Sequence, residues 1–313
     1  MSVNPVPVPE QDARYGEVYD RGYAHYDGPR RGRRGAVTSL IGYSMKRAMG
    51  IRKSWTAKVM PFILYVAAAI PLIVIIGVLA VVRRMGDFAD LADFRDMLSY
   101  SAYYSAIFTM LGLFVAIAAP EMICVDRHER TLPLYFSRAI NRGDYVLAKI
   151  VAITLLAMTM TALPGALLWL GRQLTEEQAR QAMVDNANDL LKLIVLGTLT
   201  SLMYGTVGLM VSSFTNRKGV AIAIILIGFM VLAGVGHGLS AALADYDWAR
   251  WVLLLDASMV VTSLSNHFFN DVSGNAMINR LAISQTEAIL IMLGISLLAG
   301  LILRWRYAPR DDV

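Results

Sequence analysis

The sequence predicts an all-α integral membrane protein with six transmembrane helices. Six apolar stretches, each of about 20 residues or more, are long enough to cross a hydrocarbon core of about 30 Å. They cover residues 60–82, 97–120, 146–170, 190–213, 220–242 and 282–303. The composition agrees, because 56% of the 313 residues are hydrophobic, 17% are charged and the mean hydropathy is +0.51. A soluble domain has no use for so much continuous apolar surface.

The distribution of basic residues predicts which side of the membrane each connection occupies. With the N-terminus placed in the cytoplasm, 21 of the 29 Lys and Arg residues fall on the cytoplasmic side. This asymmetry is the one that the positive-inside rule describes. We therefore expect a multi-pass protein of the cell (plasma) membrane with both termini in the cytoplasm.

The chain before the first span divides into two parts. Residues 1–36 are rich in Pro, Gly, Tyr and Arg and lack an apolar core of signal-peptide length, so we expect a disordered cytoplasmic tail there. Residues 37–58 predict an N-terminal amphipathic helix that lies in the membrane interface, ahead of a transmembrane domain over 59–313. Its apolar face consists of Val37, Leu40, Ile41, Met45, Ala48, Ile51 and Trp55, and Arg47 falls on a flank.

The second span carries a polar and aromatic face, formed by Tyr100, Tyr103, Tyr104 and Thr109. Such a face is suited to line a substrate cavity for an amphipathic molecule. The same tyrosines lie near the outer end of the span, where an aromatic belt is expected. The sequence leaves both interpretations open.

The fourth span contains small residues at a spacing of four, with one further glycine beyond them. These residues are Gly197, Ser201, Gly205 and Gly208. Small side chains on one helix face let a neighbouring helix approach closely, so they predict a helix-packing seam.

The stretch 243–281, between spans five and six, is long and unusually aromatic for a solvated loop. It contains Trp248, Trp251, Phe268 and Phe269. Aromatic side chains at this density predict short extracellular re-entrant helices at the outer interface.

The strongest functional signal lies between spans two and three, over residues 121–145. Pro120 is expected to end the second span, and Asp144 is expected to cap the third. Between them lie paired charges and a short apolar segment, which together predict a docking surface with an apolar centre and a charged rim. The candidate contact residues are Glu121, Arg127, Glu129, Arg130, Thr131, Leu132, Leu134, Tyr135, Phe136, Ser137, Arg138 and Arg142, and Asp126 belongs to the same charged cluster.

This segment resembles one in the membrane subunits of type-2 ATP-binding-cassette exporters, the ABC-2 permeases. The similarity is carried by Arg127, Thr131, Leu132, Leu134, Ser137, Arg138, Arg142, Tyr145 and Lys149, together with the six-span layout and the interfacial helix. Ala139 stands where many relatives have proline, and Pro133 falls inside the helical stretch. The resemblance implies that this segment is a coupling helix, which sits in a cleft of an ATPase subunit.

The chain has no G-x-x-x-x-G-K-[ST] sequence and so no phosphate-binding loop of that kind. We therefore expect a permease without an ATPase site or bound cofactor of its own, with ATP and Mg²⁺ on a partner ATPase subunit. The resemblance further implies a second permease chain, identical or paralogous, and export of a hydrophobic or amphipathic substrate. Membrane lipid is an expected partner, and nucleic acid is not.

Two other classes of protein remain as alternatives. A secondary transporter or channel without an ATPase partner should show inverted repeats, broken helices or mid-depth charges, which are not clear in the sequence. An integral membrane enzyme should show a cluster of catalytic residues at the interface, and four histidines do not make one.

Overall fold

The computed structural model describes residues 32–51, 55–84, 99–137, 140–176, 178–243, 245–270 and 276–308. Most of the predicted tail over 1–36 therefore lies outside the described residues, and so does Arg138.

Helices account for the regular structure in these ranges, which contain no β-strand. The helices are α1 (Gly32–Ala48), α2 (Trp55–Arg84), α4 (Tyr100–His128), α5 (Leu132–Phe136), α6 (Arg142–Leu174), α7 (Ala179–Asp185), α8 (Ala187–Ser212), α9 (Lys218–Ala242), the 3-10 helix η1 (Asp247–Leu255), α10 (Ala257–Phe269), α11 (Ala276–Leu281) and α12 (Gln285–Arg306).

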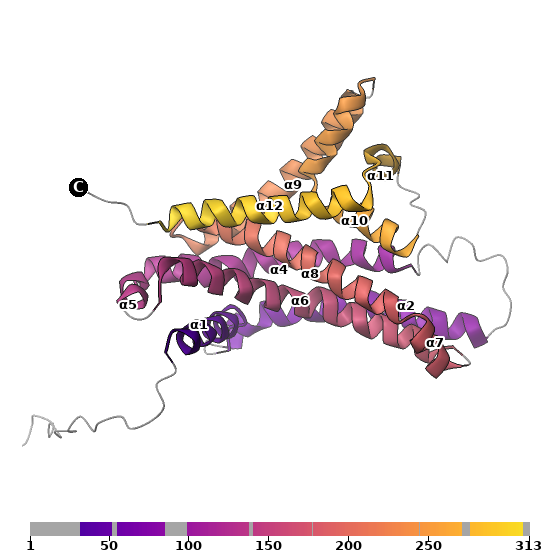
Figure 1. The fold of residues 1–313 in the computed structure, drawn as a ribbon, viewed down its shortest axis with the longest axis horizontal. Coiled ribbons are helices and arrows are strands. Elements are labelled where there is room, and N and C mark those ends of the chain that lie inside the picture. The colour runs from indigo at the N-terminus through magenta and orange to yellow at the C-terminus, as the bar shows by residue number, and fades with distance from the viewer. Residues whose placement is uncertain are drawn as a thin grey trace, which may run out of the picture. The chain divides into compact units, whose positions relative to one another are not determined.

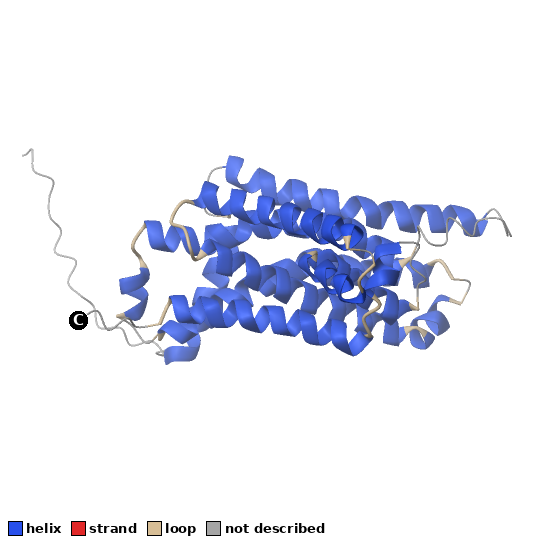
Figure 2. Cartoon of the chain, turned by 90° about the horizontal axis from the view of Figure 1, so that it is seen from above, coloured by secondary structure: helices blue, strands red, loops and turns tan. Residues whose placement is uncertain are grey.

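Among the described helices, six are long and apolar enough to cross a membrane: α2, α4, α6, α8, α9 and α12. This confirms the predicted all-α membrane fold with six candidate spans. In Figure 1 most of these helices run alongside one another, with α5 near one end and α7 near the other, while α9 leans away. Figure 2 shows the same helices from above.

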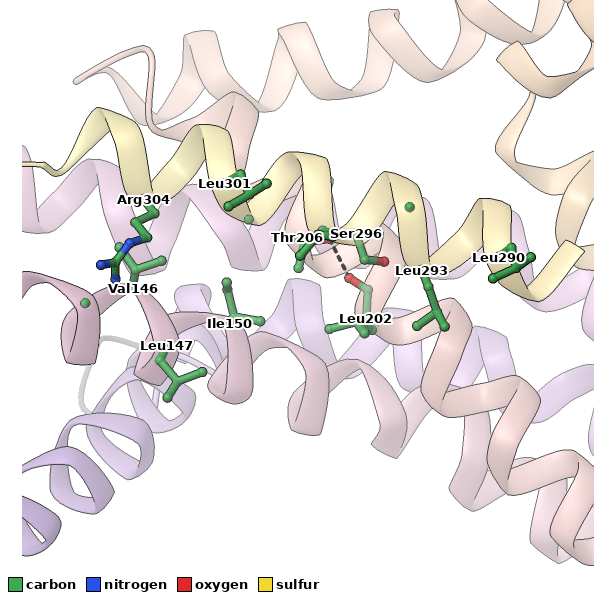
Figure 3. Close-up of a pocket in the computed structure, with 14 residues that line it drawn as sticks. Val146, Leu147, Ile150, Leu202, Thr206, Leu290, Leu293, Ser296, Leu301 and Arg304 are labelled. Carbon is green, nitrogen blue, oxygen red and sulfur yellow. Dashed lines mark hydrogen bonds between the residues drawn. The ribbon is translucent and has the colours of Figure 1, made fainter. Parts of the chain in front are cut away.

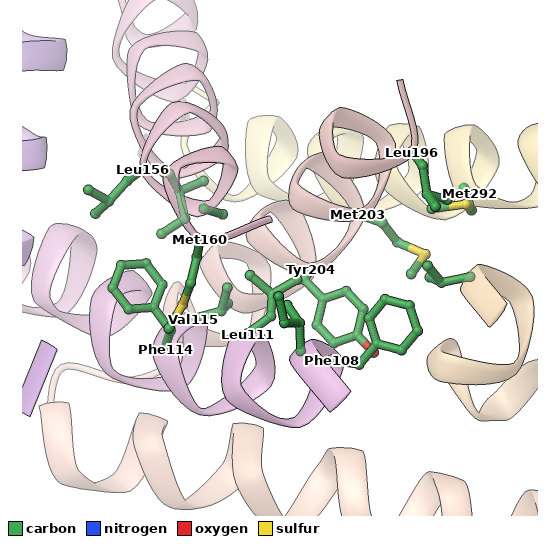
Figure 4. Packing of buried hydrophobic residues seen from close by; sticks show 14 of the residues in the cluster. Phe108, Leu111, Phe114, Val115, Leu156, Met160, Leu196, Met203, Tyr204 and Met292 are labelled. Atoms are coloured by element: carbon green, nitrogen blue, oxygen red, sulfur yellow. The ribbon is translucent and has the colours of Figure 1, made fainter. Parts of the chain in front are cut away.

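The centre of the bundle is formed by α4 with α6 and α8. Leu111 and Val115 of α4 and Met160 of α6 are fully buried, and Tyr204 of α8 packs against the same cluster (Figure 4). Lipid tails are as apolar as these side chains, so close van der Waals packing rather than escape from water holds such helices together.

The small residues of α8 allow its backbone to approach α6 closely. A Cβ added to Gly197 would lie 2.9 Å from the backbone nitrogen of Ala162, and one added to Gly205 would lie 2.9 Å from Cγ2 of Ile153. Both distances are too short for a real side chain, so a larger residue would force the helices apart at Gly197 and would displace at least the Ile153 side chain at Gly205.

The same seam continues with Ser201 and Gly208. The Ser201 hydroxyl lies 2.9 Å from the Thr161 hydroxyl of α6, and both side chains are fully buried. A Cβ at Gly208 would collide with Val115 of α4. The four predicted seam residues thus face two neighbouring helices, α6 first and then α4.

Pro120 does not end the second span, as the sequence analysis expected. Helix α4 runs through it to His128. Proline removes one backbone donor from a helix but does not have to end it when packing holds the next turns in place. Here Met122, Ile123 and Asp126 are fully buried beyond the proline.

The single interfacial helix predicted over 37–58 is instead two segments. Helix α1 ends at Ala48, Gly50 adopts a left-handed backbone with φ +65°, and α2 begins at Trp55. The buried stripe of α1 is Leu40, Ser44, Arg47 and Ala48, so Arg47 lies on the buried face rather than on a flank. The amphipathic pattern was misleading because an arginine side chain usually reaches solvent, whereas Arg47 forms an ion pair with the buried Asp126.

Short helices occupy the stretch between the last two long helices. Helices η1 and α10 meet at a bend of 105°, and α11 follows after residues that are not described. Phe268 is buried, while Trp248 and Trp251 are exposed. The position of these helices in an outer membrane interface stays a prediction.

Candidate functional site

The connection between α4 and α6 reverses the chain at one end of the bundle. Arg130 follows the last turn of α4 with a left-handed backbone, φ +52°. The Thr131 hydroxyl then donates to the carbonyl oxygen of Asp126 at 3.2 Å, which fixes the start of α5 against the end of α4. Helix α5 is a single short turn, and its position therefore depends on the residues that it contacts.

The N-terminus of α6 is capped by Asn141, not by Asp144 as the sequence analysis expected. The Asn141 N–H donates to Oδ2 of Asp144 at 3.1 Å, within the first turn of α6. The same carboxylate accepts two hydrogen bonds from Arg33 of α1, both 2.7 Å. Asp144 thus joins the beginning of α6 to α1.

Asp126 is the centre of a buried charge cluster that joins α1, α4 and α6. Its Oδ1 lies 2.6 Å from Nη1 of Arg47, and its Oδ2 lies 2.7 Å from Nζ of Lys149. The Tyr145 hydroxyl also donates to Oδ2, at 2.9 Å. Asp126 and Lys149 are fully buried and Arg47 is 8% exposed.

Each cation of this cluster has further partners. Lys149 donates to the Ser44 hydroxyl at 3.0 Å and to the Met122 carbonyl at 2.8 Å, and Nη2 of Arg47 lies 3.2 Å from Glu129. Two cations therefore face two carboxylates, Asp126 and Glu129. A buried charge is strongly unfavourable without such partners, so this cluster holds the ends of three helices in one arrangement.

Helix α5 packs on this cluster through one face and leaves the other face open. The rings of Tyr135 and Phe136 lie 5.9 and 6.0 Å from the ring of Tyr145, measured between centroids. Burial raises the pKa of Tyr135 to about 12, so its hydroxyl stays protonated at neutral pH. Leu132 is also partly buried, but Leu134 is 67% exposed. The four apolar residues expected to dock a partner thus divide into three that pack within the chain and one that is available.

Two other predicted contact residues bind the end of α4 to its neighbours. Glu121 forms an ion pair with Lys218 at the start of α9, and Arg127 donates to the carbonyl oxygen of Ser213 just after α8. Their side chains therefore connect α4 to the α8–α9 turn.

The remaining predicted contact residues that the structure describes have exposed side chains. Arg130, Ser137 and Arg142 are exposed, as is Leu134, and we call these four residues the α5 surface. The Arg142 guanidinium also donates to the carbonyl oxygen of Ala308 at 3.0 Å. The α5 surface combines one large apolar side chain with two cations, and its supporting residues are those that contact the buried cluster.

The tyrosines predicted to line a cavity are packed inside the chain. Tyr103 and Tyr104 are fully buried, Tyr100 is 7% exposed, and the Tyr104 hydroxyl donates to the Leu193 carbonyl at 2.9 Å. Thr109 differs, because it lines a pocket of about 410 Å³ between α4, α9 and the η1–α10 bend. None of the three predicted tyrosines lines this pocket.

Sequence reasoning did not single out Arg47, Asp126 and Lys149 as a unit, although all three were noticed in separate patterns. A usable signal was present. Lys149 is the one charged residue in the predicted span 146–170, and an ionisable residue inside a span normally has a partner of opposite charge.

The comparisons with known proteins agree with this architecture. Residues 80–305 match a family model described as ABC-2 family transporter protein. No curated protein matches the chain. The matched residues include the whole α4–α5–α6 connection and the candidate spans after α2, except for the last residue of α12.

Proposed function

The chain belongs to the ABC-2 family of transporter proteins, whose members are membrane-spanning permease subunits of ATP-binding-cassette transporters; on this premise, we propose that a separate ATPase subunit drives it through the α5 surface. ATP and Mg²⁺ would be bound by that subunit. The chain itself would contribute the transport pathway and the contact that transmits the movement.

One observation above all supports this proposal: an exposed apolar residue belongs to a short helix that packs on a buried charge cluster. Leu134 is 67% exposed, while its neighbours Tyr135 and Phe136 pack on Tyr145, which binds Asp126. A push on α5 would therefore reach Asp126 and, through its ion pairs, α1 and α6. Packed elements with few alternative arrangements transmit such displacements well.

The proposed transport cycle is alternating access. Closure of two ATPase subunits on nucleotide would move the α5 surface of two permease chains, and the helices would open the pathway to the other side. We propose export of a hydrophobic or amphipathic substrate across the plasma membrane, with both termini in the cytoplasm. The mainly apolar lining of the pocket beside Thr109 supports this substrate class.

The test is assembly with the ATPase subunit, using Leu134→Glu. Leu134 does not support the chain's own core, so the variant should insert and fold normally. A glutamate at the centre of an interface is unfavourable and repels carboxylates of the partner. Replacing a hot-spot residue typically costs about 2 kcal/mol or more of binding free energy. We expect copurification with the ATPase subunit to fall at least about tenfold.

Val184→Glu is the matched control, because Val184 is 73% exposed on α7 at the other end of the bundle. It introduces the same charge and should leave assembly intact. Full assembly and full transport by Leu134→Glu would remove α5 as the coupling contact. Loss of assembly in both variants would point to general damage and would equally contradict the proposal.

A further inference from the structure

Helices α6, α8 and α12 enclose a long apolar groove that the proposed coupling function does not use. Its volume is about 680 Å³. Figure 3 shows Leu147 and Ile150 of α6, Leu202 of α8, and Leu293 and Leu301 of α12 along it.

The walls of this groove offer no free hydroxyl group. The two hydroxyl side chains in its lining bond within their own helices: Thr206 donates to the Leu202 carbonyl and Ser296 donates to the Met292 carbonyl, both at 2.7 Å. A polar ligand would find no side-chain donor along the walls between these apolar residues, and the two hydroxyl side chains are themselves buried. The walls therefore favour a hydrocarbon chain.

One end of the groove is charged. Arg304 lies there, in the last turn of α12, and it is exposed, with no carboxylate partner among the described residues. It reaches over Gly143 of α6 so closely that a Cβ on that glycine would lie 2.8 Å from its Nη1. The nearby Asp144 carboxylate is already bound by Arg33 at 2.7 Å through both oxygens. The guanidinium thus remains available to an anion at the mouth of the groove.

From these features we propose that the groove binds an anionic phospholipid, with an acyl chain between α6, α8 and α12 and the phosphate on Arg304. The groove follows α12 from Leu290 to Arg304. At a rise of 1.5 Å per residue this is roughly 21 Å, which exceeds the half-thickness of about 15 Å of a hydrocarbon core. An acyl chain of ordinary length therefore fits within it.

The rim of the groove favours lipid over a second copy of the chain. Leu147 is 58% exposed and Leu297 is 65% exposed, so long, flexible side chains form the edges. Helix–helix contacts in membranes prefer small residues at the edge of contact, because backbones must come close. Gly294 and Gly300 also line the groove, but the exposed leucines beside them keep a neighbouring helix backbone at a distance that a thin acyl chain can fill.

The experiment is lipid counting by native mass spectrometry. The full-length protein is reconstituted in nanodiscs of phosphatidylcholine mixed with phosphatidylglycerol, released, and weighed with its retained lipids. We expect a preference for phosphatidylglycerol of about fivefold, the size expected for one basic residue near an anionic headgroup. Arg304→Gln should abolish the preference but retain lipid, and Leu297→Trp should lower retention of both lipids by filling the groove.

Two matched controls separate the groove from the general surface. Lys46→Gln removes an exposed cation on α1, and Leu298→Trp enlarges a side chain that is 61% exposed on α12 but does not line the groove. Both should behave like the unsubstituted protein. Equal retention of the two lipids, an unchanged preference in Arg304→Gln, or displacement of the lipid by inorganic phosphate alone would overturn the proposal. So would conversion of a dimer into a monomer by Leu297→Trp at constant lipid content.

Discussion

Lys149 and Asp126 form a fully buried ion pair, 2.7 Å between Nζ and Oδ2, that joins the third long helix to the end of the second. Tyr145, whose hydroxyl also donates to Asp126, contacts α5, the short helix that we propose receives the movement of an ATPase subunit. Arg47 binds the other carboxylate oxygen from α1. This geometry gives one aspartate the role of holding three helix ends together.

Asp126→Asn should destabilise the protein strongly, because it leaves Arg47 and Lys149 buried without their shared carboxylate. Removing one partner of a buried pair typically costs about 3–5 kcal/mol. Unfolding in mixed detergent micelles measures the loss. Adding Lys149→Met to the same protein should recover part of it, because one unpaired cation disappears.

Asp189→Asn is the control for this prediction. Asp189 and Lys192 form a 2.9 Å pair on α8 whose side chains are each 29% exposed. Such a pair contributes about 1 kcal/mol or less. If both aspartate variants lose the same stability, the buried cluster has no special role in holding the helix ends.

The six long helices were predictable, whereas the charge cluster was not. Continuous apolar runs such as 220–242 predict the length of a membrane-spanning helix directly. The spacing of Gly197 and Gly205 predicts close packing against a neighbouring helix. The cluster depends on three residues from separate segments, with Arg47 and Asp126 79 positions apart. Nothing local in the sequence specifies which carboxylate a cation will meet. The prediction that Pro120 ends the second span was wrong for a similar reason. Whether the helix continues depends on how the residues after the proline pack against other helices, which the local sequence does not specify.

Gly197→Ala should loosen the contact between α8 and α6. The added Cβ would lie 2.9 Å from the backbone of Ala162, which cannot rotate away. Overpacking of this kind costs about 1–3 kcal/mol. Gly228→Ala is the control, since a Cβ there meets nothing within 4 Å. It should be neutral or stabilising by up to about 1 kcal/mol, because alanine favours helix. Equal effects of the two variants on unfolding would contradict a packed seam.

The proposed orientation predicts which positions can be labelled from outside the cell. In a Cys124→Ser background, Ser2→Cys and Asp312→Cys should react with a membrane-impermeant maleimide only after the membrane is permeabilised. Asp247→Cys, at the start of η1, should react in intact cells. Labelling of either terminus from outside would reverse the orientation and place α5 out of reach of a cytoplasmic ATPase.

The last prediction concerns transmission from α5 to the helices. Tyr145→Phe keeps the ring that Tyr135 and Phe136 contact but removes the hydroxyl that donates to Asp126 at 2.9 Å. A hydrogen bond to a charged group contributes about 1.5–3 kcal/mol, so stability should fall by that order. Assembly with the ATPase subunit should persist, because Leu134 is untouched. Substrate transported per ATP hydrolysed, measured in proteoliposomes, should fall because the ring that α5 contacts is no longer hydrogen-bonded to Asp126.

Tyr307→Phe distinguishes this mechanism from a general effect of removing a buried hydroxyl. The Tyr307 ring lies 5.4 Å from the ring of Tyr145, and its hydroxyl is buried with no hydrogen-bond partner among the described residues. Burial raises the pKa of Tyr307, so the group stays neutral at physiological pH. Removing an unsatisfied hydroxyl is close to neutral, so stability and transport per ATP should not change. If Tyr307→Phe and Tyr145→Phe lower the substrate transported per ATP hydrolysed equally, the movement of α5 is not transmitted through Asp126. The buried cluster then only stabilises the fold.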